Sequence, residues 1–435
     1  MKLGNMTVCV QGLWHLGSVT AAALASLGFH VVGLDETPDT AALLAQGRAP
    51  VMEPGLDDLL RQGLDAGHLS FTISREVALA HADVLWVTYD TPVDEDDVAD
   101  VDAVIASVLS SISCLRPGAV VLVSSQLPVG SISRLEEESF RIRQAKDVFF
   151  ACSPENLRLG NALKVFLEPD RIIVGCRDIS ARNVLERLLS PISSQLEWMR
   201  TESAEMTKHA INAFLATSVV FANEIACLCE ATGADAKEVE RGLKTEQRIG
   251  PKAYLSPGAA FAGGTLARDI AFLGTVAQIN QLQVPLLHSV KVSNDAHKSW
   301  VKIKLATLFP KLTGVHIAVW GLTYKAGTDT LRRSAAVELV EYLCGQGANV
   351  HVHDPAVPQL PANWGPLIQR HTDPISAVAR AQVLVVGTAW PEYRNIAPEM
   401  VFSKNPNLAV IDADRFLLGW ADKVSTYYAV GSTNQ

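Results

Sequence analysis

The chain has 435 residues, of which 48% are hydrophobic and 19% are charged. That length suits two or three domains, and that composition excludes intrinsic disorder and collagen-like structure. With 37 basic and 46 acidic residues the net charge is −9, which argues against nucleic acid as a partner. Seven cysteines without disulfide or zinc spacing predict a cytoplasmic protein that has no metal site.

Short apolar runs alternate with helical patterns in both halves of the chain. Buried strands are expected at residues 7–10, 31–35, 84–87, 120–123, 148–150, 316–320, 350–353, 383–386 and 409–411. Helices are expected at residues 18–27, 202–232, 284–308 and 334–346. Strands that alternate with helices form parallel sheets covered on both faces. The sequence therefore predicts an α/β protein with two Rossmann-like doubly wound domains joined by a long central helix.

The long helix is apolar on nearly all sides, so we expect it to lie between two domains or two subunits. Its most apolar run, residues 211–229, contains Asn212, Asn223 and Glu224. These polar residues favour a buried helix over a membrane span, and no membrane partner is expected.

A glycine motif lies between the first strand and the first helix. Gly12 and Gly17 bracket the turn, and Asp35 ends the next strand about twenty residues further on. In a dinucleotide fold the first glycine makes the turn, the helix N-terminus holds the pyrophosphate, and the acid binds the ribose hydroxyls. The acid favours NAD, because it would repel the extra phosphate of NADP. Trp14 replaces the usual middle glycine, which leaves an ordinary strand-to-helix turn as an alternative.

Further motifs come in a fixed order along the chain. They are residues 50–56 (PVMEPGL), 91–92 (TP), 125–131 (SQLPVGS), 153–158 (SPENLR), 205–208 (EMTK), 212–214 (NAF), 223–224 (NE), 248–250 (RIG), 257–264 (PGAAFAGG), 321–325 (GLTYK) and 328–334 (TDTLRRS). In this order and spacing they resemble the UDP-glucose/GDP-mannose 6-dehydrogenase family over essentially the whole chain.

The resemblance implies an oxidoreductase that oxidises the C6 alcohol of a nucleotide sugar such as UDP-glucose twice, with two NAD, in the supply of precursors for polysaccharides or glycosides. It implies an NAD-binding domain over residues 1–198, a central helical dimerisation region over 199–300, and a nucleotide-sugar-binding domain over 301–435. The expected partners are a nucleotide-sugar substrate and a second copy of the chain in a homodimer.

The resemblance also assigns site residues. The catalytic candidates are Lys208, Asn212, Asp269, Glu155, Thr265 and Gln126. The NAD-binding candidates are Gly12, Trp14, Leu16, Gly17, Asp35, Thr91, Pro92, Ser125 and Arg332. The substrate-binding candidates are Arg248, Tyr254, Leu255, Phe261, Gly263, Tyr324, Lys325 and Arg415, with Arg248 reaching in from a neighbouring subunit.

The chemistry of these residues agrees with such a site. Lys208 and Asn212 are four residues apart, so both project from one face of the helix. An ammonium and an amide together can stabilise a developing alkoxide. Asp269 can act as a base through water, and Glu155 follows a strand end, where a parallel sheet opens to its ligand.

The sequence departs from the family pattern at its nucleophile. The family cysteine aligns with Thr265 and the following lysine with Arg268, whereas Gln126 and Leu159 replace a threonine and a second glutamate. A threonine hydroxyl is a poor nucleophile unless a base activates it, so a thioester cannot form at position 265. Three alternatives remain: oxidation of a hydrated aldehyde, an enzyme that stops at the aldehyde or uses transient oxidation as an epimerase does, and a non-catalytic nucleotide-sugar binding protein. A nucleophile at Cys152 is the other option, against a buried structural cysteine.

Overall fold

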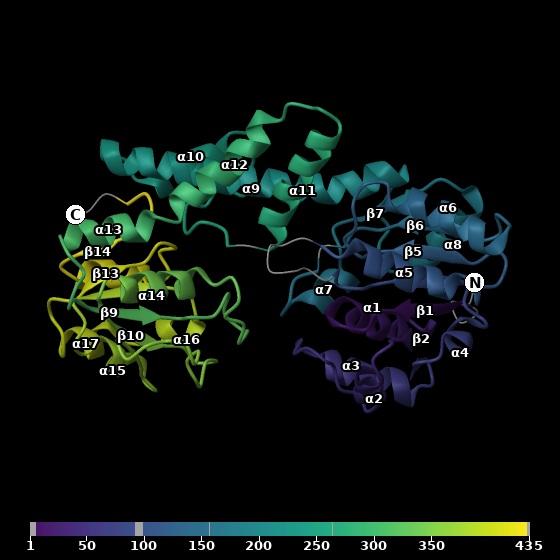
Figure 1. Cartoon of the computed structure of the whole chain (residues 1–435), viewed down its shortest axis with the longest axis horizontal. Helices are drawn as coiled ribbons and strands as arrows, with labels where there is room; N and C mark the ends of the chain where they lie inside the picture. Colours follow the sequence, from purple (N-terminus) through teal and green to yellow (C-terminus); the bar gives the residue numbers. More distant parts are fainter. Residues whose placement is uncertain (1–5, 92–98, 156, 263, 433–435) are drawn as a thin grey trace. The chain divides into compact units, whose positions relative to one another are not determined.

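The computed structural model of the chain describes residues 6–91, 99–155, 157–262 and 264–432. The chain forms two compact units, residues 1–210 and 211–435. The boundary lies within the long helix α9 (Thr201–Thr232), which begins in the first unit and ends in the second (Figure 1). The three-part division expected from the sequence stays a prediction.

The first unit is built around a sheet whose strand order, over the described residues, is β3-β2-β1-β4-β5-β6-β7-β8. Its strands are β1 (Thr7–Gln11), β2 (His30–Leu34), β3 (Leu69–Thr72), β4 (Val84–Val87), β5 (Val120–Val123), β6 (Phe149–Cys152), β7 (Ile172–Cys176) and β8 (Leu196–Met199). Its helices are α1 (His15–Ser26), α2 (Pro38–Ala45), α3 (Leu56–Asp65), α4 (Arg75–Leu79), α5 (Val101–Ile112), α6 (Ser131–Arg143), α7 (Ala162–Leu167) and α8 (Ile179–Leu189).

This order is that of a doubly wound fold, with the topological switch point between β1 and β4. Strands β1, β4 and β5 are buried almost completely, which explains why they consist of continuous apolar runs. The strands that the sequence predicts in this unit pair in parallel, whereas β7, which it does not predict, pairs antiparallel with β6. Gly175 allows this pairing to pack closely, since a Cβ there would lie 2.7 Å from the Cys152 sulfur.

The second unit contains a sheet in which every pair within the described residues is parallel, in the order β11-β10-β9-β12-β13-β14. Its strands are β9 (His316–Trp320), β10 (Asn349–His353), β11 (Ile368–Arg370), β12 (Val383–Val386), β13 (Ala409–Ile411) and β14 (Tyr427–Tyr428). Its helices are α10 (Ala236–Thr245), α11 (Thr265–Ile279), α12 (Pro285–His297), α13 (Trp300–Leu308), α14 (Ala335–Gly345), α15 (Pro374–Val378), α16 (Pro391–Arg394) and α17 (Pro398–Phe402), with a 3₁₀ turn at Leu418–Lys423. The two Rossmann-like sheets and the long helix confirm the predicted fold class.

Helix α9 is less buried than its sequence predicts. Among the described residues it is the one helix long and apolar enough to cross a membrane, and 44% of its most apolar 18-residue window is buried. Phe214, Phe221 and Leu228 remain 70%, 45% and 61% exposed. The single chain therefore leaves part of the apolar surface of α9 uncovered.

Candidate active site

The two glycines of the first motif are required by close backbone packing. Gly12 has φ +91°, and a Cβ there would lie 2.9 Å from the Tyr89 backbone nitrogen. A Cβ on Gly17 would lie 1.9 Å from the Gly12 carbonyl oxygen. Helix α1 can therefore begin directly against the end of β1 only because both positions lack a side chain. This is the geometry of a dinucleotide-binding turn rather than of an ordinary connection.

Asp35 holds the same turn from the neighbouring strand. Its carboxylate accepts hydrogen bonds from the backbone nitrogens of Leu13 (2.8 Å) and Thr37 (2.9 Å). Trp14 precedes α1 with φ −73°, so replacing the middle glycine costs no backbone strain, and its side chain is 52% exposed. Leu16, two residues further on, lies on the buried face of α1.

A pocket of about 400 Å³ opens at the carboxyl ends of β5 and β6. Four predicted site residues line it, namely Ser125, Gln126, Glu155 and Lys208. The Ser125 hydroxyl is buried and has no hydrogen-bond partner among the described residues. Thr91 donates to the Gln126 carbonyl oxygen (2.7 Å), which joins the loop after β4 to the loop after β5. The unpaired hydroxyl and the glycine turn fit a bound dinucleotide in this unit. Pro92 lies outside the described residues.

The first turns of α9 hold both loops that form this pocket. Lys208 Nζ donates to the Glu155 carbonyl oxygen (2.6 Å), and His209 Nε2 lies 3.2 Å from the Leu127 carbonyl oxygen. The Glu205 carboxylate accepts hydrogen bonds from the backbone nitrogens of Gly130 (2.7 Å) and Ile132 (2.9 Å), where α6 begins. Burial raises the pKa of Glu205, while these backbone donors oppose the rise. One helix thus positions the lysine and the loops around it.

In the second unit, the glycine-rich run is anchored by polar side chains from three other segments. Phe261 exchanges two backbone hydrogen bonds with the Asn294 side chain (3.0 and 2.8 Å). Gly258 N donates to Asn223 Oδ1 (3.0 Å), and Ala259 N donates to Asp414 Oδ1 (2.7 Å). A glycine-rich segment would otherwise be free to move, so these contacts fix its path. Gly263 lies outside the described residues.

Two predicted catalytic residues of the second unit are in direct contact. Asn212 Nδ2 donates to Asp269 Oδ2, and both side chains are buried. Thr265 begins α11, and Asp269 follows one turn later on the same helix. A Cβ on Gly264 would lie 3.4 Å from the Tyr324 hydroxyl, so the loop after β9 lies beside the start of α11.

The loop after β9 repeats the turn after β1. Gly321 has φ +87°, and a Cβ there would lie 2.5 Å from the Thr388 backbone. Asp354, at the end of β10, accepts hydrogen bonds from the backbone nitrogens of Leu322 (2.6 Å) and Thr323 (3.0 Å). Glycine and aspartate therefore occupy corresponding positions in both units, a correspondence that the sequence alone does not reveal. In this loop the side chains of Tyr324, Lys325 and Arg332 are exposed.

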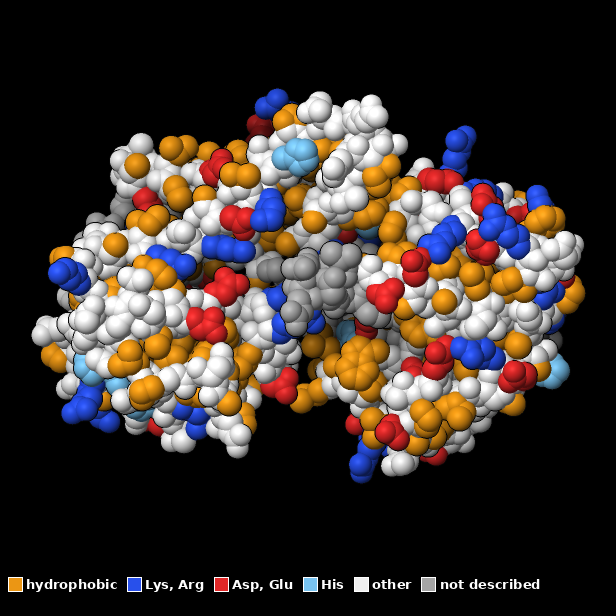
Figure 2. All heavy atoms as spheres, viewed as in Figure 1, with side chains coloured by type: hydrophobic (Ala, Val, Ile, Leu, Met, Phe, Trp, Pro, Cys, Tyr) orange, Lys and Arg blue, Asp and Glu red, His pale blue; other side chains and the backbone are white. Residues whose placement is uncertain are grey.

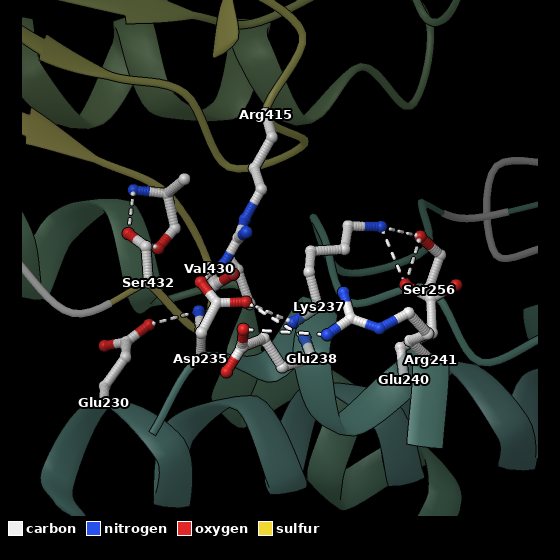
Figure 3. A network of polar contacts seen from close by, with 12 residues as sticks. Glu230, Asp235, Lys237, Glu238, Glu240, Arg241, Ser256, Arg415, Val430 and Ser432 are labelled. Atoms are coloured by element: carbon white, nitrogen blue, oxygen red, sulfur yellow. Dashed lines mark hydrogen bonds and ion pairs between the residues drawn. The ribbon is translucent and has the colours of Figure 1, made fainter. Parts of the chain in front are cut away.

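The Arg415 side chain pairs with a residue outside the glycine-rich run. Its guanidinium pairs with Asp235 at 3.1 Å, next to the start of α10, and its side chain is only 8% exposed (Figure 3). Its neighbour Asp414 is the residue that contacts the glycine-rich run. Arg248 projects outward, with its side chain 89% exposed, and pairs with Glu246. Tyr254 is exposed and Leu255 is partly buried.

The cysteine that lines the pocket does not have the properties of an activated nucleophile. Cys152 lines the pocket beside Lys208, but burial raises the pKa of its thiol, and its sulfur contacts the Thr201 carbonyl oxygen. Burial also raises the thiol pKa of Cys9, Cys176 and Cys227. A nucleophilic thiol needs a lowered pKa. The described residues also contain no cluster of three or more His, Cys, Asp or Glu that could hold a metal ion.

Glu53 and His15 have a structural role in the first unit, and the sequence alone identifies neither of them. Glu53, in the PVMEPGL motif, accepts a hydrogen bond from His15 at the start of α1. The motif is recognisable, but the partner lies 38 residues away and only the fold joins the two.

Comparison with known proteins identifies the family. The models of the UDP-glucose/GDP-mannose dehydrogenase family match in three parts: the NAD binding domain at residues 6–193, the central domain at 202–296 and the UDP binding domain at 318–418. A UDP-glucose 6-dehydrogenase from Pseudomonas aeruginosa is 35% identical over 403 residues, covering 89% of each chain. One from Rhizobium meliloti is 34% identical over 396 residues, covering 89% of this chain and 90% of the relative.

Among solved structures, a UDP-glucose dehydrogenase from the hyperthermophilic archaeon Pyrobaculum islandicum superposes with a TM-score of 0.87 at 29% identity, over 98% of both chains. The resemblance noted in the sequence is thereby confirmed, and NAD is the cofactor. The chain belongs to the UDP-glucose/GDP-mannose dehydrogenase family and is an NAD-dependent nucleotide-sugar dehydrogenase.

Proposed function

We propose that this enzyme oxidises the C6 alcohol of UDP-glucose or a closely related UDP-hexose. The proposal is supported by the match of residues 318–418 to the family's UDP binding domain and by relatives at 35% and 34% identity that are named UDP-glucose 6-dehydrogenases. Lys325 and Tyr324, in the glycine-anchored loop after β9, are the proposed contacts to the nucleotide. Arg248 is proposed to act across a subunit interface, in keeping with its exposed side chain.

Lys208 and Asn212 are the proposed donors to the C6 oxygen. When bound, NAD would supply the hydride acceptor for C6. The hydroxyl proton would pass through water to Asp269, and the Lys208 ammonium and the Asn212 amide would stabilise the negative charge that develops on the oxygen. The hydrogen bond from Lys208 to the Glu155 carbonyl supports this role, because it holds the lysine chain in one position.

We propose that the second oxidation proceeds through the hydrated aldehyde. Water adds across the C6 carbonyl to give a gem-diol. Transfer of its C6 hydride to a second NAD, with release of both hydroxyl protons, would give the carboxylate. The route needs no thiol, which suits Thr265 and the raised pKa values of the buried cysteines. Asp269, fixed by Asn212, is the proposed acceptor of the proton from the attacking water.

Counting NADH released per UDP-glucose consumed tests this proposal, with the product identified by mass. We expect two NADH and the uronic acid. One NADH with an aldehyde product would instead establish a two-electron enzyme, and no NADH with both ligands bound would establish the binding-protein alternative. Thr265→Cys is a matched probe: iodoacetamide should inactivate this variant but leave the wild-type enzyme active.

We further propose a homodimer in which α9 packs against its copy. The exposed Phe214, Phe221 and Leu228 recur every seven residues, so they form one stripe along the helix. Phe221→Glu should convert the dimer to a monomer of 46.8 kDa in light scattering, since the charge would be buried at the interface. Met400→Glu, at an exposed apolar residue of α17, is the matched control and should leave the dimer intact.

A cytoplasmic location is proposed from the seven cysteines, all of which are free thiols. Neither nucleic acid nor membrane is a proposed partner. On the face drawn in Figure 2, basic and acidic side chains are interspersed rather than gathered by sign. Such a surface lacks the concentrated positive charge that phosphate backbones require.

A further inference from the structure

Glu53 connects three segments of the cofactor-binding unit. Its side chain is 1% exposed. Oε2 accepts hydrogen bonds from His15 Nε2 (3.0 Å) and from Gly160 N (2.7 Å), and Oε1 accepts one from Ala162 N (2.8 Å). Burial opposes ionisation of this carboxyl, but the donors, His15 first among them, lower the pKa of Glu53 overall. The donors to this buried carboxylate therefore come from the first residue of α1, from the first residue of α7 and from the turn just before α7.

His15 lies where the pyrophosphate of a dinucleotide binds. It is the first residue of α1, and the N-terminus of this helix is the anion site of the fold. Its side chain is 17% exposed. Nε2 is engaged by Glu53, while Nδ1 has no hydrogen-bond partner among the residues that the structure describes. Glu53 thus holds Nε2 in place, and Nδ1 is available to contact a ligand.

The presence of Trp14 explains why a side-chain donor to the pyrophosphate is needed at His15. The middle glycine of a dinucleotide fingerprint lets the backbone approach the pyrophosphate closely, and a tryptophan at this position adds a large side chain there. We therefore expect a weaker direct backbone contact to the pyrophosphate in this chain. A side-chain donor on the next residue can replace it.

We propose that His15 is a cofactor-binding residue that donates its Nδ1 hydrogen to the NAD pyrophosphate, with Glu53 as the positioning residue that orients the ring. The imidazole then donates from both ring nitrogens and lies between two anions. The charge-assisted bond compensates for the glycine that Trp14 replaces. This inference concerns the cofactor alone and is independent of which sugar the enzyme oxidises.

His15→Gln tests the proposal, because glutamine can still donate to Glu53 but has no second donor nitrogen for the pyrophosphate. We expect KM for NAD to rise about tenfold, which corresponds to one charge-assisted hydrogen bond, while kcat and KM for the sugar stay within about twofold. The dissociation constants of NADH and ADP-ribose, measured by titration without turnover, should rise by the same factor. Binding of adenosine, which has no phosphate, should not change.

Further variants separate binding from stability. His15→Phe should raise KM for NAD to a similar extent and also lower the melting temperature, since it leaves the Glu53 carboxylate with only its backbone donors. His81→Gln, at an exposed histidine of the same unit, is the matched control and should match the wild type. An unchanged KM for NAD in His15→Gln would overturn the proposal. An equal rise in KM for NAD and in KM for the sugar would also overturn it, because it would indicate a general loss of structure.

Discussion

Lys208→Met is expected to lower kcat by about a hundredfold or more while NADH binding and the melting temperature stay close to wild type. The variant keeps the apolar part of the side chain but removes the ammonium that is proposed to stabilise the C6 alkoxide. Removing one such donor from an oxyanion site typically costs two to three orders of magnitude in rate. Steady-state kinetics at saturating NAD and UDP-glucose measures the loss.

Two companion variants make this result specific. Lys208→Arg keeps a positive charge in a different shape, so we expect partial activity between that of Lys208→Met and the wild type. Lys404→Met, at an exposed lysine of the second unit, should leave kcat unchanged. Survival of full activity in Lys208→Met would show that the pocket between β5, β6 and α9 is not the centre of the reaction.

Gly17→Ala should abolish NADH binding and destabilise the first unit. The added methyl group would lie 1.9 Å from the Gly12 carbonyl oxygen and 2.8 Å from Thr88 Oγ1, so α1 must move away from β1. Overpacking of this kind costs about 1–3 kcal/mol, and the displaced helix N-terminus no longer meets the pyrophosphate. Thermal unfolding and NADH fluorescence titration measure the two effects.

Gly242→Ala provides the matched control for that substitution. Gly242 lies within α10, and a Cβ there would meet no atom within 4 Å. Alanine favours a helix over glycine, so this variant should be neutral or slightly more stable than the wild type. If Gly17→Ala bound NADH with normal affinity, the cofactor would have to bind elsewhere than at the start of α1.

The central strands could be predicted from the sequence, whereas several edge strands could not. β1, β4, β5, β9 and β12 are buried on both faces and consist of continuous apolar residues. β3 and β8 are half-buried at the two edges of their sheet, and β14 has only two residues, so none produces a clear pattern. The reversed direction of β7 depends on the path of the chain, which periodicity does not record.

The candidate site, like the sheets, could be predicted from the sequence only in part. The ordered motifs predicted Ser125, Gln126, Glu155 and Lys208, and the fold brings all four to one pocket. The partnerships that support them depend on contacts between distant segments, such as that of Glu205 with the start of α6, and no local pattern contains them. The substrate-binding role of Arg415 stays a prediction: its guanidinium pairs with Asp235, while its neighbour Asp414 contacts the glycine-rich run.

The recurrence of one turn in both sheets has a consequence for how this enzyme could diversify. In each sheet a glycine makes the turn after the first strand, and an aspartate at the end of the neighbouring strand accepts a hydrogen bond from the backbone of that turn. These residues are Gly12 with Asp35 and Gly321 with Asp354. The connections from these turns to the next helix differ in length, since α1 begins at residue 15 whereas α14 begins only at residue 335. If the loop after β9 contacts the nucleotide as proposed, insertions and exchanges in the longer connection would alter sugar-nucleotide recognition without disturbing the turn after β1, so the two specificities could evolve separately.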